Sequence, residues 1–232
     1  SYLEKAVELI SDNAEVIASL GSVLKENGDY EKAKEKTLLA ISMKDDARFY
    51  FNLATIFRDQ GDLGSAKEKY YKALKLQNNF PEAYNNLGEI SRDEGDSAKA
   101  ADFFRKALNM DSSFGRALYN LGILYQDKGE FSEAAESFRK SKIEDWKARV
   151  CYCHYKENNL TKFLSEFKTT TSLPHWSPLL ASLSAHYSKS YNKADPYNFC
   201  VDPLNYVRKR TITVLSEPNS DFRTELINQL NK

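Results

Sequence analysis

Several kinds of residue are scarce in this chain of 232 residues, which has three cysteines, six prolines and nine glycines. The cysteines, Cys151, Cys153 and Cys200, are too few and odd in number for a disulfide framework. They favour free thiols in a reducing compartment, and we expect a cytoplasmic protein. Because proline and glycine are rare, long disordered stretches are not expected.

The chain also lacks a net charge, because 33 Lys and Arg residues balance 33 Asp and Glu residues. The two signs are interspersed along the sequence, as is typical of a solvated helical surface. Nucleic acids and anionic membranes attract an excess of positive charge, so neither is expected as a partner. No apolar run approaches the roughly 18 residues of a membrane-spanning helix, so no membrane segment is expected either.

What the sequence does contain is a short phrase that recurs every 34 residues: Asn52-Leu53-Ala54, Asn86-Leu87-Gly88 and Asn120-Leu121-Gly122. A fixed period of this length indicates a stacked repeat. The apolar spacing within each unit is three or four residues, which predicts amphipathic helices instead of strands.

Four full units can be aligned, at residues 14–46, 47–80, 81–114 and 115–143. In each unit a first helix is predicted to end at a glycine: Gly28, Gly61, Gly95 and Gly129. An acid follows near the start of the second helix: Asp29, Asp62, Asp96 and Glu130. Small residues at fixed places, such as Gly21, Ala54, Gly88 and Gly122, predict close packing of neighbouring helices.

This pattern closely resembles the tetratricopeptide repeat, a helix–turn–helix unit of about 34 residues. The resemblance covers roughly residues 1–177 and implies an all-α fold, a right-handed α-solenoid of stacked helix–turn–helix units. Residues 1–13 are interpreted as a half repeat, and the sequence therefore as part of a longer protein. Residues 144–177 are interpreted as a degenerate repeat that caps the stack, because Asn158 and Phe163 replace the usual glycine and small alanine.

Residues 178–232 are predicted to form a capping helix and a linker toward a further domain. Ser177 and Pro178 are a typical helix start, and residues 221–231 are predicted to form a last amphipathic helix. The run 197–207 resembles a junction in bacterial proteins in which tetratricopeptide repeats precede an Fe(II)/2-oxoglutarate-dependent oxygenase domain. That resemblance implies that the chain is the recruiting arm of such an enzyme.

Catalytic chemistry is not expected within the chain itself. The oxygenase class needs two histidines and a carboxylate around iron, but His154, His175 and His186 are not followed two residues later by Asp or Glu. The run Cys151-Tyr152-Cys153-His154 has no evident fourth ligand, so packing is preferred to a zinc site. We therefore predict a non-enzymatic chain with no catalytic residue, metal or cofactor.

In a tetratricopeptide stack the first helices line the concave face, and the three asparagines fall on them. An amide offers one acceptor and two donors, so a row of asparagines can hold the backbone of an extended peptide. The row resembles the asparagine ladder of the O-GlcNAc transferase family, whose solenoid is also fused to a catalytic domain. The alternative is that these asparagines bond locally between helices. The predicted groove residues are Asn52, Asn86, Asn120, Arg48, Phe51, Thr55, Arg58, Asn85, Glu89, Arg92, Arg116, Tyr119 and Ile123.

The leading hypothesis is a scaffold that holds a protein or an extended peptide in this groove. One alternative is a substrate-recruitment arm of a larger enzyme, an Fe(II)/2-oxoglutarate oxygenase or, second, a glycosyltransferase. Another is weak homo-oligomerisation through the open repeat ends, because exposed apolar edges mark association sites.

Overall fold

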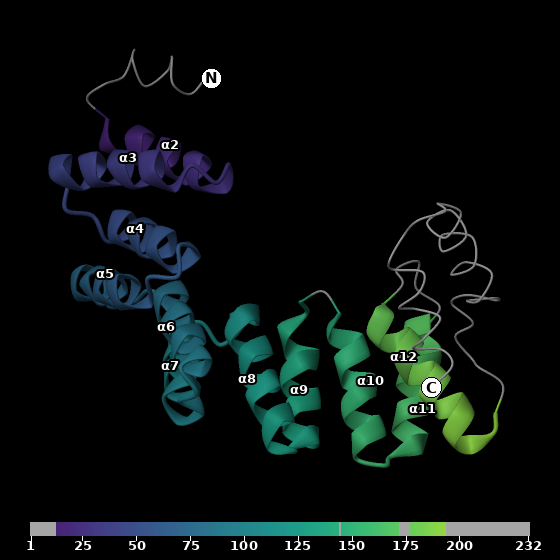
Figure 1. The fold of residues 1–232 in the computed structure, drawn as a ribbon. Coiled ribbons are helices and arrows are strands. Elements are labelled where there is room, and N and C mark those ends of the chain that lie inside the picture. The colour runs from purple at the N-terminus through teal and green to yellow at the C-terminus, as the bar shows by residue number, and fades with distance from the viewer. Residues whose placement is uncertain (1–12, 144, 172–176, 194–232) are drawn as a thin grey trace, which may run out of the picture. The chain divides into compact units, whose positions relative to one another are not determined.

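The computed structural model describes residues 13–143, 145–171 and 177–193 (Figure 1). All the regular secondary structure in these ranges is α-helical. The chain divides into two compact units, Ser1–Glu166 and Phe167–Lys232, which are treated separately below. None of the described helices is long and apolar enough to cross a lipid bilayer.

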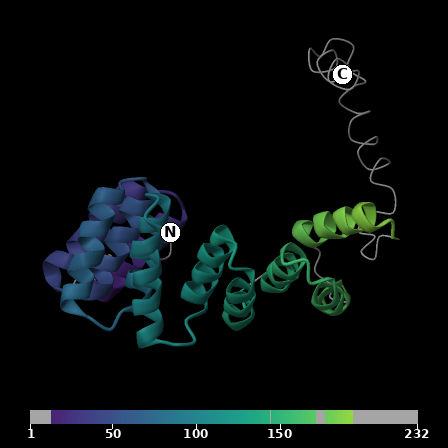
Figure 2. The ribbon, with the colours of Figure 1, turned by 90° about the horizontal axis from the view of Figure 1, so that it is seen from below.

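The helices of the first unit pack in consecutive pairs, side by side in both ribbon views (Figures 1 and 2). The pairs are α2 (Ala14–Glu26) with α3 (Tyr30–Met43), α4 (Ala47–Asp59) with α5 (Leu63–Leu76), α6 (Pro81–Asp93) with α7 (Ser97–Met110), and α8 (Gly115–Lys128) with α9 (Phe131–Ser141). Each pair falls within one predicted repeat. Each second helix also packs on the first helix of the next pair, so the predicted stack of helix–turn–helix units is confirmed.

A left-handed glycine reverses the chain between the two helices of every one of these pairs. The φ angles of Gly28, Gly61, Gly95 and Gly129 lie between 80° and 85°, a region in which a side chain is strained. The second helix starts immediately afterwards. In three pairs the carboxylate of the following Asp29, Asp62 or Asp96 accepts a hydrogen bond from a backbone N–H of the helix's first turn.

The fifth pair departs from this pattern, as the sequence predicts. It consists of α10 (Trp146–Lys156) and α11 (Leu160–Thr171). Asn158 takes the left-handed turn position with a φ of 59°, a conformation that asparagine tolerates better than most residues. Phe163 is fully buried where the other pairs carry an alanine. The preceding helix α9 has 11 residues, against 14 in α3, α5 and α7.

The boundary between the two compact units lies inside α11, earlier than the predicted domain boundary after residue 177. Helix α12 (Pro178–Tyr191) begins at the predicted place, where the Ser177 hydroxyl accepts a hydrogen bond from the backbone N–H of Leu180. Its buried side chains include Leu180, Leu183 and Tyr187. Three predicted segments lie outside the described residues. They are residues 1–12 of the half repeat, the run 197–207 and the helix predicted at 221–231.

Candidate peptide-binding groove

A groove of about 380 Å³ lies on the first helices of four consecutive repeats. Its lining residues come from α2, α4, α6 and α8: Ser22, Lys25, Glu26, Phe51, Asn52, Thr55, Arg58, Asn86 and Arg116. Six of these are predicted groove residues. Since second helices contribute no lining residue, the groove lies on the helices that the sequence indicates.

Asn52 lies in the part of the groove formed by α2 and α4. Its side-chain amide donates a hydrogen bond to the Ser22 hydroxyl of α2 over 3.3 Å. One turn later, the Thr55 hydroxyl donates to the backbone carbonyl of Asn52 over 2.8 Å. Beside it, the Phe51 ring stacks on Tyr70 and Phe80, with ring centroids 5.6 and 4.9 Å apart. Phe51 is therefore a fixed apolar wall of the groove.

Asn86, the next asparagine of the row, contacts the second helix of the preceding repeat. Its amide donates to the phenol oxygen of Tyr70 over 2.9 Å. Tyr70 is fully buried, and this burial raises its pKa to about 12. The phenol is therefore neutral near pH 7, and its hydrogen bond fixes the Asn86 side chain, which is largely buried and lines the groove.

Asn120 is buried in a polar network and does not line the groove. Its amide nitrogen donates to Asn85 over 3.0 Å and to Glu89 over 3.1 Å, and its oxygen accepts from Arg92 over 3.1 Å. Asn85 also donates to Glu89 over 2.9 Å. These bonds tie α8 to α6, which is the local interhelical role that the sequence analysis left open.

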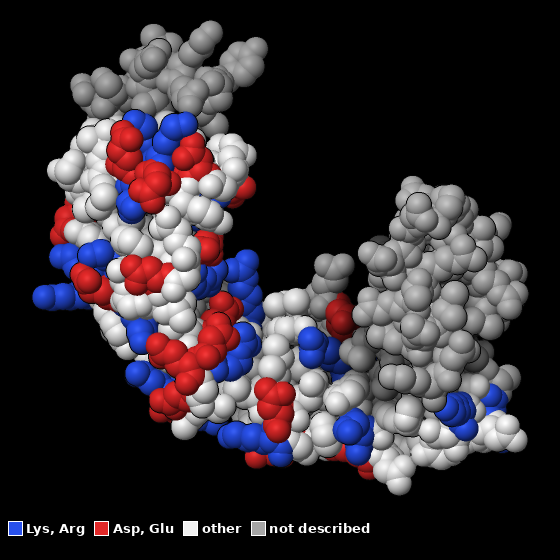
Figure 3. Space-filling model, viewed as in Figure 1, with Lys and Arg blue, Asp and Glu red and all other residues white. Residues whose placement is uncertain are grey.

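Two of the four charged residues that line the groove are neutralised by a neighbour. Arg58 forms an ion pair with Glu89 over 3.1 Å, and Lys25 forms one with Asp59 over 3.4 Å. Both pairs link the first helices of adjacent repeats. Figure 3 shows basic and acidic side chains interspersed over α2–α7 on the face in view, in line with the balanced composition.

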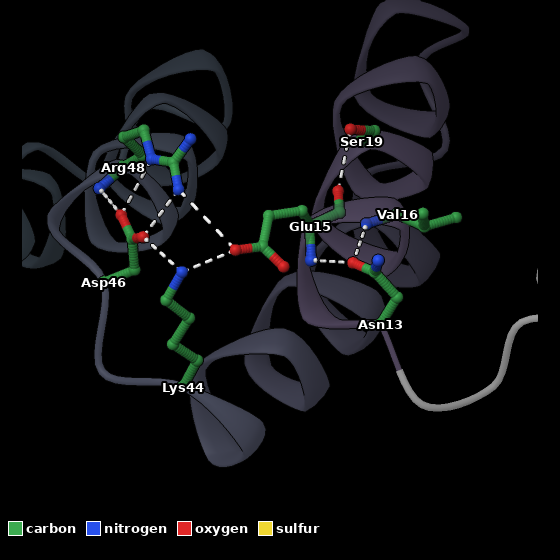
Figure 4. Close-up of polar contacts among 7 residues, drawn as sticks. All are labelled: Asn13, Glu15, Val16, Ser19, Lys44, Asp46 and Arg48. Atoms are coloured by element: carbon green, nitrogen blue, oxygen red, sulfur yellow. Dashed lines mark hydrogen bonds and ion pairs between the residues drawn. The ribbon is translucent and has the colours of Figure 1, made fainter.

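Arg48 lies at the start of α4 and is not among the groove-lining residues. Its guanidinium forms two hydrogen bonds with the Asp46 carboxylate, of 2.9 and 2.7 Å (Figure 4). Asp46 also contacts Lys44, which reaches Glu15 of the same repeat, and Glu15 lies 3.9 Å from the Arg48 guanidinium. The Arg48 guanidinium holds the pKa of Asp46 well below its usual range, so the carboxylate is charged at neutral pH. This cluster joins the first two repeats.

Tyr119 and Ile123 lie on α8 and pack against the buried cluster around Phe138, outside the groove lining. The Tyr119 hydroxyl accepts a hydrogen bond from Arg149 of α10 over 2.5 Å. The Arg149 guanidinium also lies 5.0 Å from the centre of the Tyr119 ring. These contacts connect the fourth repeat to the fifth.

Three groove residues on α2 were not predicted: Ser22, Lys25 and Glu26. Sequence alignment of the repeats places Ser19 at the position of the asparagines, but the Ser19 hydroxyl donates to the backbone of its own helix (Figure 4). Ser22, one turn later, is the residue that meets Asn52. Glu89 stands at the same offset after Asn86 and likewise meets the asparagine of the next repeat, Asn120, but only the structure shows this pairing.

Metal-binding clusters of three or more His, Cys, Asp or Glu residues do not occur among the described residues. Cys153 and His154, from the run that resembles a metal motif, are buried in α10. Burial raises the pKa of the Cys153 thiol to about 12, so this thiol is protonated at neutral pH.

Comparisons with solved structures identify proteins of the same fold. The Pseudomonas aeruginosa protein pilF has a TM-score of 0.69 at 17% identity, covering 93% of this chain and 97% of its own. YrrB, described as a TPR protein with an unusual peptide-binding site, has a TM-score of 0.57 at 16% identity, covering 82% and 98%. MamA has a TM-score of 0.51 at 22% identity, covering 69% and 87%. At these identities the likeness concerns the fold.

A comparison with curated proteins gives no significant match. Family models do match the repeats. A model described as TPR repeat matches residues 54–91, and one described as tetratricopeptide repeat matches residues 14–46, 81–114 and 115–142. Together with the paired helices and their left-handed glycines, these matches show that the chain belongs to the tetratricopeptide repeat family.

Proposed function

We propose that this chain is a non-catalytic interaction scaffold that holds an extended peptide in the groove on α2, α4, α6 and α8. The observation that carries the proposal is the composition of the groove wall, where side-chain amides, hydroxyls and cations stand beside one aromatic ring. Specific ligand sites combine apolar surface with a few placed polar groups in this way.

Asn52 and Asn86 are the two residues suited to hold the peptide backbone. In the described part of the chain, each gives one amide N–H to a neighbour, Ser22 or Tyr70. Each amide has a second N–H and a carbonyl oxygen, which match the C=O and N–H of a peptide unit. The existing bonds fix the orientation of both side chains, so little conformational entropy is lost when a ligand binds.

Asn120 has a different role in this proposal. All three of its hydrogen bonds join it to residues of α6, and unlike Asn52 and Asn86 it does not line the groove. We therefore assign peptide contact to Asn52 and Asn86, and assign to Asn120 the spacing of α6 and α8. YrrB, which has the same fold, is described as having a peptide-binding site, and this supports a peptide as the class of ligand.

A cytoplasmic location belongs to the same proposal and rests on the sparse cysteines. The run 197–207, which suggests an enzyme's recruiting arm, lies outside the described residues. Association through repeat ends likewise stays a prediction.

The proposal is tested by enriching a random peptide library on the wild-type chain and measuring the affinity of the enriched peptides by fluorescence anisotropy. The double variant Asn52→Ala/Asn86→Ala removes both backbone-binding amides. Each lost hydrogen bond contributes about 0.5–1.5 kcal/mol, so we expect affinity to fall about tenfold or more. The matched control is Asn109→Ala, an exposed asparagine on the second helix α7.

The control should bind as the wild type does. Equal binding by the double variant and the control, or no enrichment at all, contradicts a peptide site in this groove. Circular dichroism and thermal unfolding of each variant establish that the helices are retained.

A further inference from the structure

Two charged residues of the groove have no ion-pair partner among the described residues: Glu26 on α2 and Arg116 on α8. Both are exposed. The other two charged lining residues, Lys25 and Arg58, are held by Asp59 and Glu89. The uncompensated charges of the groove are therefore one acid and one base.

These two charges stand on the first and the last of the four lining helices. Between them, α4 contributes the apolar wall of Phe51 and the amide of Asn52, and α6 contributes Asn86. From α2 to α8, the groove thus presents an acidic side chain, then an aromatic ring with an amide, then a second amide, and last a basic side chain. This order selects the charge pattern of a ligand, which a backbone-binding amide alone does not.

We propose that the groove selects a peptide segment with an acidic side chain for Arg116, a basic side chain for Glu26 and an apolar side chain between them for Phe51. This inference rests on the proposed function, and it adds the ligand's charge pattern. Complementary charges on an exposed rim give selectivity and faster association more than raw affinity. Each pair should change affinity roughly two- to fivefold.

Because of Glu89, the α8 end of the groove selects only one acidic side chain of the peptide. Its carboxylate pairs with Arg58, so the guanidinium of Arg58 is already neutralised when a ligand arrives. Arg116 is then the one lining cation of the described chain that is not already paired.

The test uses peptides enriched on the wild-type chain and resynthesised with their acidic and basic residues replaced by Gln. For this comparison both charged residues of each peptide are replaced by Gln, which removes the two charges and keeps the net charge of the pair at zero. The double variant Glu26→Gln/Arg116→Gln removes the two charges of the groove in the same way. We expect the wild type to prefer the original peptides by about four- to twenty-five-fold, the product of two pairs, and the variant to show no such preference.

The matched control is Glu133→Gln/Arg105→Gln, which removes one exposed acid and one exposed base on the second helices α9 and α7. It should keep the wild-type preference. Binding that depends on Asn52 and Asn86 but shows no preference between the original and the Gln-substituted peptides overturns this inference and leaves the peptide groove in place. Binding that is independent of Asn52 and Asn86 overturns both.

Discussion

At the residue scale, a glycine on the first helix allows the two helices of a pair to approach each other closely, because it has no side chain. A Cβ atom added to Gly88 would lie 2.5 Å from the Phe104 ring, and one added to Gly122 would lie 2.7 Å from the Phe138 ring. Phe104 and Phe138 are fully buried at the same place in consecutive repeats. The large aromatic ring of α7 or α9 therefore requires glycine on the facing helix.

We predict that Gly88→Ala destabilises the chain by about 1–3 kcal/mol, because the added methyl group overpacks a filled core. The measurement is the free energy of unfolding from urea denaturation. Gly64→Ala is the control: the new Cβ there would meet only the Asp62 carboxylate, at an ordinary distance of 3.6 Å. It should be neutral or stabilising by up to about 1 kcal/mol. Equal stability of the two variants would show that the Gly88 contact is not tight.

Tyr70 gives a second prediction, on the pH dependence of stability. Burial raises the pKa of its phenol to about 12, whereas an unfolded tyrosine ionises near pH 10. The unfolded state therefore loses its proton first as pH rises. The stabilisation linked to this group is complete below about pH 10 and is lost as pH rises through about 12, by at most about 2–3 kcal/mol.

The variant Tyr70→Phe cannot ionise, so the stability difference between wild type and Tyr70→Phe should shrink as pH rises through that window. Denaturant unfolding at a series of pH values measures the difference. Tyr71→Phe, which changes an exposed neighbour, should give a difference that does not vary with pH. A constant difference for Tyr70→Phe would contradict the assignment of the raised pKa.

At the element scale, an acid stands before every second helix of the four regular pairs, yet its side chain acts as a cap in only three. The Asp96 carboxylate accepts a hydrogen bond from the backbone N–H of Lys99 over 3.0 Å. Glu130 occupies the same place before α9 and makes no capping hydrogen bond. The additional methylene of glutamate makes it a poorer N-cap than aspartate.

We predict that Asp96→Ala destabilises the chain by about 0.5–2 kcal/mol, because it leaves a backbone N–H of α7 without its cap. Glu130→Ala provides the matched control and should change stability by less than about 0.5 kcal/mol. Thermal unfolding followed by circular dichroism compares the two. A cost at Glu130 as large as that at Asp96 would mean that the acid acts through its charge and not through the cap.

The boundaries of the helices were predictable because the residues at each boundary are suited to the local backbone conformation or to capping the helix. Gly61 ends one helix because its φ angle is positive, and Asp62 starts the next through its carboxylate. Even the irregular fifth pair carries such a mark, since Asn158 tolerates the left-handed turn. Periodic sequence signals of this kind depend on neighbours within a few residues.

The site was less predictable, because the role of a groove residue depends on partners a whole repeat away. Asn52, Asn86 and Asn120 look equivalent in sequence. Asn120 does not line the groove, because Glu89 and Arg92 of the preceding first helix take up its hydrogen bonds, whereas Asn52 meets only Ser22 there. Arg48, another predicted groove residue, likewise forms hydrogen bonds with Asp46 and does not line the groove. The period of the sequence shows on which face of a helix a residue lies, but it does not show which residue of the neighbouring repeat pairs with it.

At the scale of the whole molecule, each repeat contacts its neighbours along the stack, so contacts between adjacent repeats define the groove. Arg58 of α4 pairs with Glu89 of α6, and Glu89 accepts from Asn120 of α8. One carboxylate thus connects three consecutive first helices, all of which line the groove. The spacing of Asn52 and Asn86 depends on this polar network.

The central claim is that a peptide ligand lies on the first helices. Amide hydrogen exchange, followed by mass spectrometry with and without an enriched peptide, tests it directly, since a ligand bound to the native state slows exchange where it stabilises the fold. The account predicts slower exchange in α2, α4, α6 and α8, and a smaller effect in α3, α5 and α7. Protection confined to the second helices, or none at saturating peptide, would contradict the account.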